Sequence, residues 1–233
     1  MKKVLLLVVS IIMAASLVAQ DINTIIKKHE DAINAKKLNS FKTMKIIGTF
    51  SQMGMAMDMT LIEKAPDKVK TVVTFNGMEI VTVVNGDKGY MINPMMGSAE
   101  PTPMAAADIS QSLENKMLGS SIRKQMEIGK LELVGEEDYN GTKCYKLKSE
   151  TVAGNAFLYI DAKSFLNIAV KLTTVQMGQE MGIEMRMSDF RESEGVLMAM
   201  TTETYMNGEM TGTLVYKSIE FDLTIDDSVF EVK

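Results

Sequence analysis

The pattern of apolar and polar positions predicts one helical segment followed by a long series of strands. Between residues 21 and 38, isoleucines and His29 recur at intervals of three and four with charged residues between them. This spacing predicts an amphipathic helix with Asp21 as its N-cap. After Ser40 apolar and polar residues alternate, as in half-buried strands. We predict strands over residues 43–50, 53–63, 68–75, 78–84, 88–92, 131–135, 143–150, 156–161, 166–175, 180–190, 196–206 and 211–221.

Four Asn-Gly pairs mark turns between these strands. They lie at residues 76–77, 85–86, 140–141 and 207–208, and Asn-Gly accommodates the positive φ angles of a tight two-residue hairpin. Hairpin spacing leaves no room for crossover helices, so the sheet is predicted to be antiparallel. With no linker or internal repeat visible, we expect a single domain over residues 21–233.

Residues 93–118 interrupt the series of hairpins. Three of the four prolines of the chain fall within residues 93–103, and a helical pattern follows over residues 104–118. A loop of this kind followed by a weakly amphipathic helix is typical of a flap over one face of a sheet, although a plain surface excursion has the same pattern. The flap would contact the sheet through residues four apart, which are Ile109, Leu113 and Met117.

The first twenty residues have the pattern of a secretory signal peptide. Two lysines precede an apolar run over residues 4–18, and small residues lead to a cleavage point near Ala19 and Gln20. The run is short for a membrane span, which needs about 20 apolar residues. No cysteine lies near the cleavage point, so we expect no lipid anchor. The sequence therefore predicts an exported, soluble protein.

Methionines form two stripes along the predicted strands. In each stripe alternate residues share one face of the strand; the first comprises Met53, Met55, Met57, Met59 and Leu61, and the second Met181, Ile183, Met185 and Met187. Methionine specifies a packed core poorly but adapts well to a flexible apolar ligand. A lipid-binding surface is therefore one interpretation. The alternatives are a loosely filled core and a Cu(I) site, since thioethers are soft ligands.

Composition narrows the possible functions. The chain has 233 residues, 22 of them Met, no Trp, and a net charge of −5 from 25 basic and 30 acidic residues. That charge argues against nucleic acid as a partner. A single Cys and a single His exclude an internal disulfide and a multi-His metal centre. Cys144 is expected to be a small buried apolar residue, and His29 a packing or surface residue. No catalytic or nucleotide-binding motif is present, so we predict a non-enzymatic protein without a cofactor.

The sequence from residue 21 onward resembles the LolA/LolB-like superfamily of bacterial lipoprotein carriers. Within that superfamily it is most similar to the Bacteroidetes-type outer-membrane lipoprotein-sorting proteins. The matching motifs keep their order and spacing along the chain. They lie at residues 25–32, 42–48, 63–69, 85–94, 145–148, 159–161, 188–192, 195–196 and 226–230.

The resemblance implies an α+β fold with a strongly curved antiparallel sheet, an unclosed half-barrel whose helices cover an apolar concave face. It implies a carrier, expected to be a monomer, that binds lipid or lipoprotein acyl chains and exchanges them with lipoprotein-transfer proteins of the inner and outer membranes. Related half-barrels also serve as envelope sensors or scaffolds. In the carrier an Arg directly before a Pro governs the lid, whereas here Ala65 precedes Pro66.

Together these patterns predict the residues that bind the ligand. Ligand would compete with the flap helix, residues Ile109, Leu113 and Met117, for one apolar surface. The predicted lining of that surface comprises Met53, Met55, Met57, Met59, Leu61, Val73, Phe75, Met181, Ile183, Met185 and Met187.

Overall fold

The computed structural model describes residues 21–231, except residues 53, 120–121, 128, 152–153 and 177–178. The predicted signal peptide and Met53 lie outside the described residues. The helices are α1 (Ile22–Ile33), α2 (Ala35–Leu38), α3 (Ala106–Glu114) and α4 (Ile122–Glu127), with 3-10 helices η1 (Pro94–Met96) and η2 (Asp227–Phe230). The strands are β1 (Thr43–Gln52), β2 (Met55–Lys64), β3 (Lys68–Phe75), β4 (Met78–Asn85), β5 (Lys88–Asn93), β6 (Ser98–Pro103), β7 (Leu131–Tyr139), β8 (Thr142–Thr151), β9 (Gly154–Asp161), β10 (Asn167–Gln176), β11 (Gln179–Ser193), β12 (Val196–Met206) and β13 (Glu209–Phe221).

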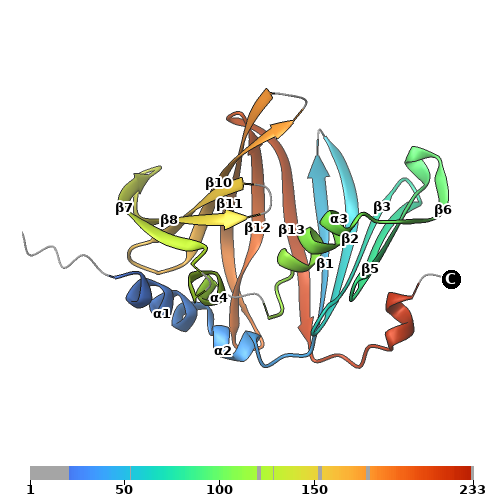
Figure 1. Cartoon of the computed structure of the whole chain (residues 1–233), viewed down its shortest axis with the longest axis horizontal. Helices are drawn as coiled ribbons and strands as arrows, with labels where there is room; N and C mark the ends of the chain where they lie inside the picture. The colour runs from blue at the N-terminus through green and yellow to red at the C-terminus, as the bar shows by residue number, and fades with distance from the viewer. Residues whose placement is uncertain are drawn as a thin grey trace, which may run out of the picture.

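All of these strands join one antiparallel sheet that does not close into a barrel. Its 13 strands follow the order β6-β5-β4-β3-β2-β1-β13-β12-β11-β10-β9-β8-β7. The sheet curves around α3, as Figure 1 shows. The predicted α+β half-barrel with an N-terminal helix is therefore confirmed.

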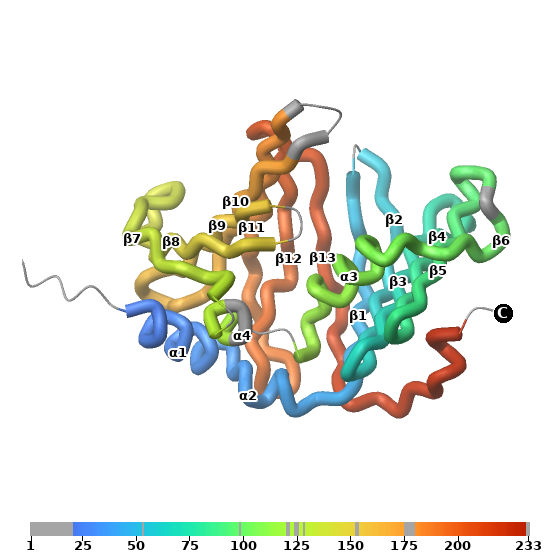
Figure 2. Tube along the Cα trace, in the orientation of Figure 1, coloured from blue at the N-terminus to red at the C-terminus, as the bar shows by residue number. Residues whose placement is uncertain are grey.

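The strand order explains why a helical segment crosses the sheet. Strands β1 to β6 form one meander that ends at one edge, and β7 begins the second meander at the opposite edge. The chain must travel from edge to edge between β6 and β7, and α3 and α4 lie on that path (Figure 2). This connection explains why the residues predicted as a flap lie over the sheet.

The structure corrects the prediction for residues 93–118 in two respects. The proline-containing stretch is not a loop throughout, because residues 94–96 form η1 and residues 98–103 form the edge strand β6. Pro103 lies opposite Tyr90 on β5; an edge strand tolerates proline because one side of it needs no N–H donor. The helix predicted over residues 104–118 is shorter and occupies only Ala106–Glu114.

The Asn-Gly pairs all lie at hairpins, but one differs from the other three. At residues 76–77, 140–141 and 207–208 both residues have positive φ, as a tight primed turn requires. At the fourth pair Asn85 remains in β4 and lies opposite Lys88, and only Gly86 has a positive φ. The twelve predicted strands are present, with ends that differ by a few residues.

The predicted N-terminal helix is present but interrupted. Asp21 caps it as expected, since its carboxylate accepts a hydrogen bond from the Thr24 amide at 2.9 Å. Asn34 has a left-handed backbone with φ of 55°, which ends α1 and separates it from α2. Ile25 and Ile26 of α1 are fully buried against β7, β8 and β9.

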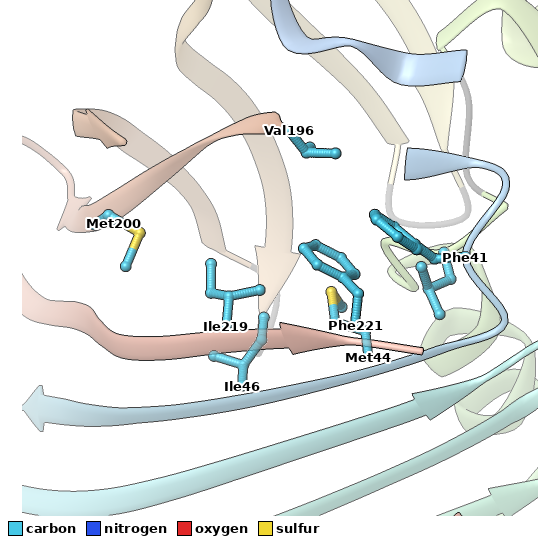
Figure 3. Packing of buried hydrophobic residues seen from close by; sticks show 8 residues of the cluster. Phe41, Met44, Ile46, Val196, Met200, Ile219 and Phe221 are labelled. Carbon is cyan, nitrogen blue, oxygen red and sulfur yellow. The ribbon is translucent and has the colours of Figure 1, made fainter. Parts of the chain in front are cut away.

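Three clusters of buried residues lie on one face of the sheet, which we call the inner face. Beneath α1 the cluster includes Leu147 and Leu158, and beneath α3 it comprises Val69, Val84 and Ile109. The central cluster joins β1, β12 and β13 and comprises Phe41, Met44, Ile46, Leu118, Val196, Met200, Ile219 and Phe221. Figure 3 shows Met44, Ile46, Ile219 and Phe221 side by side where β1 pairs with β13. A fourth cluster, which includes Cys144 and Tyr159, packs on the outer face.

Candidate functional site

The sheet register places the two methionine stripes on the same face. Met57 of β2 lies opposite Phe50 of β1, and Phe50 lies opposite Leu214 of β13. Leu214 lies opposite Thr202 of β12, which lies opposite Met187 of β11. Because residues directly opposite each other in an antiparallel sheet point to the same side, Met57 and Met187 project from one face in a single cross-strand row.

A second row connects the stripes in the same way. Met55 lies opposite Gln52, Gln52 opposite Gly212, Gly212 opposite Thr204, and Thr204 opposite Met185. On the other side of β2, Val73 lies opposite Met59, so β3 continues the same face. The structure therefore brings together on the inner face all the predicted lining residues that it describes.

Part of this face lies outside the buried clusters of the described residues. Met59 and Leu61 pack against the central cluster, but the other described lining residues belong to none of the four clusters. Met55 is 46% exposed, and the rest of these are half-buried. We call this part the open inner surface; it comprises Met55, Met57, Val73, Phe75, Met181, Ile183, Met185 and Met187.

A second part of the inner face is covered by residues 104–118, which we call the closing segment. Ile109 of α3 is buried against Val69 and Val84, and Leu113 packs on the same cluster. Gly89 of β5 makes this contact possible, because a Cβ there would lie 2.8 Å from Ile109 Cγ1 and 2.9 Å from Met104 Sδ. The predicted flap residues Ile109 and Leu113 therefore contact the sheet.

The end of the closing segment inserts into the central cluster. Leu118 is fully buried there, and Met117 packs beside it. The backbone of both residues is held by Glu63 of β2, which is 1% exposed. Glu63 Oε1 accepts a hydrogen bond from the Met117 amide at 2.9 Å, and Oε2 accepts one from the Leu118 amide at 2.8 Å.

Burial dominates the electrostatics around this carboxylate. Loss of water raises the pKa of Glu63, against the two amide hydrogen bonds and the nearby charge of Lys116, which lower it. The Lys116 Nζ donates to the Pro66 carbonyl oxygen. Burial, with a smaller contribution from the Glu63 charge, raises the pKa of Tyr216 to about 12. Glu63 is thus a polar group within an otherwise apolar part of the inner face.

The sequence analysis did not assign a role to Glu63 or Leu118. A signal for Glu63 was present, since it continues the alternation of Met55, Met57, Met59 and Leu61. A carboxylate at an inward position is unusual, because a buried charge needs partners. The position of Leu118 had no such signal, since it depends on where the segment after α3 turns into the sheet.

His29 is a buried residue of α1, which decides between the packing and surface positions that the sequence left open. Its side chain is 6% exposed, and Nδ1 donates to the Phe165 carbonyl oxygen at 2.8 Å. Burial lowers the pKa of His29, against the raising effects of that hydrogen bond and of Glu30. Protonation of this side chain therefore opposes the docking of α1 on the sheet.

We expect His29 to make the folded state less stable as the pH falls below about 6.5, its reference pKa. Below that pH the unfolded chain binds a proton at His29 more readily than the folded chain does. The stability that neutral His29 contributes above pH 6.5 is therefore lost as the pH falls from 6.5 to the lower pKa of His29 in the folded state. Urea unfolding of wild type and His29→Gln between pH 5 and 8 measures this effect. As the pH falls, the free energy of unfolding should decrease more steeply for wild type than for the variant, by at most about 1.4 kcal/mol per pH unit. An imidazole resonance that titrates above pH 6.5 would contradict this expectation.

The structure provides no preformed metal cluster in its described residues. Among them, no group of three or more His, Cys, Asp or Glu side chains is arranged to hold a metal ion. No described ladder pair places one methionine opposite another. Cys144 is buried, and burial raises the pKa of its thiol to about 11, which disfavours the thiolate that binds metals.

Sequence comparisons give no match, whereas structural comparisons give clear ones. No family model and no curated protein sequence matches this chain. A LolA superfamily protein from Nitrosomonas europaea is similar to it with a TM-score of 0.61 and 10% identity, over 92% of this chain and 99% of that one. A domain assigned to outer membrane lipoprotein sorting in Vibrio parahaemolyticus gives 0.59 and 12%, over 88% and 97%.

A third solved structure extends the comparison. A DUF1329 family protein from Desulfovibrio piger has a TM-score of 0.57 and 12% identity, over 91% of this chain and 98% of its own.

Within the described residues, no helix combines the length and the apolar character needed to cross a bilayer. At these identities the likeness concerns the fold, and it confirms the resemblance that the sequence motifs indicated: the chain has a LolA-like fold.

Proposed function

We propose that this protein is a non-enzymatic periplasmic carrier that binds lipid or lipoprotein acyl chains on its inner face, over the open inner surface and the adjoining part that the closing segment covers. The observation that supports the proposal is the placement of both methionine stripes in shared rows on one face, outside the buried clusters. A surface built only for packing would be covered. Flexible thioethers suit a ligand with many conformations.

Binding and closure would compete for the inner face. The closing segment already occupies its centre through Leu118 and the region under α3 through Ile109. An acyl chain gains about 0.8 kcal/mol for each methylene that it buries. The free-energy cost of displacing the closing segment would offset part of that gain. The affinity would therefore be moderate, and the ligand could be released to an acceptor.

The structural neighbours support the proposal without extending it to one cargo. One of them carries a description that concerns outer membrane lipoprotein sorting. The signal-peptide pattern of residues 1–20 is consistent with export. Transfer proteins of the two membranes would then be the donor and the acceptor.

Native mass spectrometry of the exported, freshly purified protein tests this function. We expect adducts with the masses of lipids or acylated peptides, which added lauramide displaces. A copper adduct that survives added acyl ligand would instead favour the Cu(I) alternative. A protein that carries no adduct and takes up no acyl ligand at micromolar concentration would contradict the carrier function.

A further inference from the structure

The Glu63 carboxylate connects the closing segment to the sheet through two hydrogen bonds. Both hydrogen bonds that the described structure gives this carboxylate come from main-chain amides of the closing segment, those of Met117 and Leu118. Glu63 lies on the inner face at the end of the same stripe as Met59 and Leu61. The closing segment therefore satisfies both carboxylate oxygens within an apolar surrounding.

Displacement of the closing segment would remove these partners together. Met117 and Leu118 take both amides with them, and Lys116, whose charge lies near Glu63, is part of the same segment. The carboxylate would then lie at the apolar surface without its amide donors. A carboxylate that a ligand covers without supplying hydrogen-bond donors is strongly disfavoured, so a ligand that supplies new donors is favoured.

We propose that Glu63 selects acyl ligands whose polar end carries N–H donors, either an amide or an ammonium group. Such a head group replaces the Met117 and Leu118 amides while the acyl chain replaces Leu118 on the inner face. A free fatty acid brings a second carboxylate to Glu63 and is repelled, and a fatty alcohol supplies only one donor. This selectivity rests on the proposed carrier function and specifies the chemical class of its ligand.

The test compares ligands that share one chain and differ only in the head group. Dodecylamine, lauramide, dodecanol and laurate displace the neutral fluorophore N-phenyl-1-naphthylamine from the mature protein at pH 8, each below its micellar concentration. For wild type we expect the amine or the amide to act at concentrations at least tenfold lower than laurate and dodecanol. A preference for lauramide indicates that the natural ligand is an N-acylated peptide, and a preference for dodecylamine indicates that it is an aminolipid.

The variant Glu63→Gln keeps the size of the side chain and removes its charge. We expect this variant to lose the preference for ligands with N–H donors over laurate. Weaker closure could raise the affinity for every ligand, but it would leave the ratio between ligands, which is the measured quantity, unaffected. Glu220→Gln, which neutralises an exposed carboxylate of β13 on the outer face, should keep the wild-type ratio.

Three results would overturn the proposal, and they distinguish a failure of the selectivity from a failure of the carrier function. Equal displacement by all four ligands in wild type, or an unchanged ratio in Glu63→Gln, removes the selectivity and leaves the carrier function intact. Displacement by none of the four ligands overturns the carrier function and the selectivity with it.

Discussion

Replacement of both Met57 and Met187 by Asp is expected to lower the affinity for lauramide by at least about 100-fold. The two side chains lie in one row of the open inner surface, on β2 and β11. Burial of one methionine side chain against a ligand contributes about 1.5–3 kcal/mol, and about 1.4 kcal/mol corresponds to a tenfold change. Each new carboxylate adds a desolvation cost. Displacement of N-phenyl-1-naphthylamine measures the effect.

The matched control places the same charges on the opposite face of the same strands. Thr60 and Ser188 are the neighbours of Met59 and Met187 that point outward. The double variant Thr60→Asp, Ser188→Asp should therefore bind lauramide as wild type does. If the Met57, Met187 variant folds cooperatively and still binds with undiminished affinity, the open inner surface is not the ligand site.

For Leu118→Ala we expect lower stability together with tighter ligand binding. Loss of a fully buried leucine costs about 2–5 kcal/mol. The same loss weakens the closed state that competes with the ligand, and each 1.4 kcal/mol taken from closure raises the apparent affinity by about tenfold. Urea unfolding and lauramide titration of the same samples measure the two changes. Weaker binding would show that the closing segment forms part of the site instead of competing for it.

Two further variants separate closure from general stability. Leu147→Ala removes a leucine that is also fully buried, but from the cluster beneath α1. This variant should have a lower stability and an unchanged affinity for lauramide.

Gly89→Val introduces a side chain where Ile109 and Met104 pack. It should move α3 away from the sheet and raise the affinity, with little effect on the strands.

Strand positions and strand faces were predictable because they depend on neighbouring residues. The alternation of Met55 and Met57 with the smaller residue Ala56 and the charged residue Asp58 identified one face of β2, and the register placed Met187 on the same face. The prediction for residues 98–103 was wrong, because the prolines there suggested a loop. Proline is compatible with a strand only at an edge, and a sequence pattern does not show which strand lies at the edge.

The sequence alone determined the antiparallel strands, most of their turns and the alternation that puts the methionines on one side. These properties follow from backbone geometry over a few residues. Only the tertiary structure decided which part of that side stays uncovered and that Glu63 binds the backbone of Met117 and Leu118. The reason is that β6 and β7 lie at opposite edges of the sheet. The connection between them crosses the inner face, and its contacts join residues more than fifty positions apart in the chain.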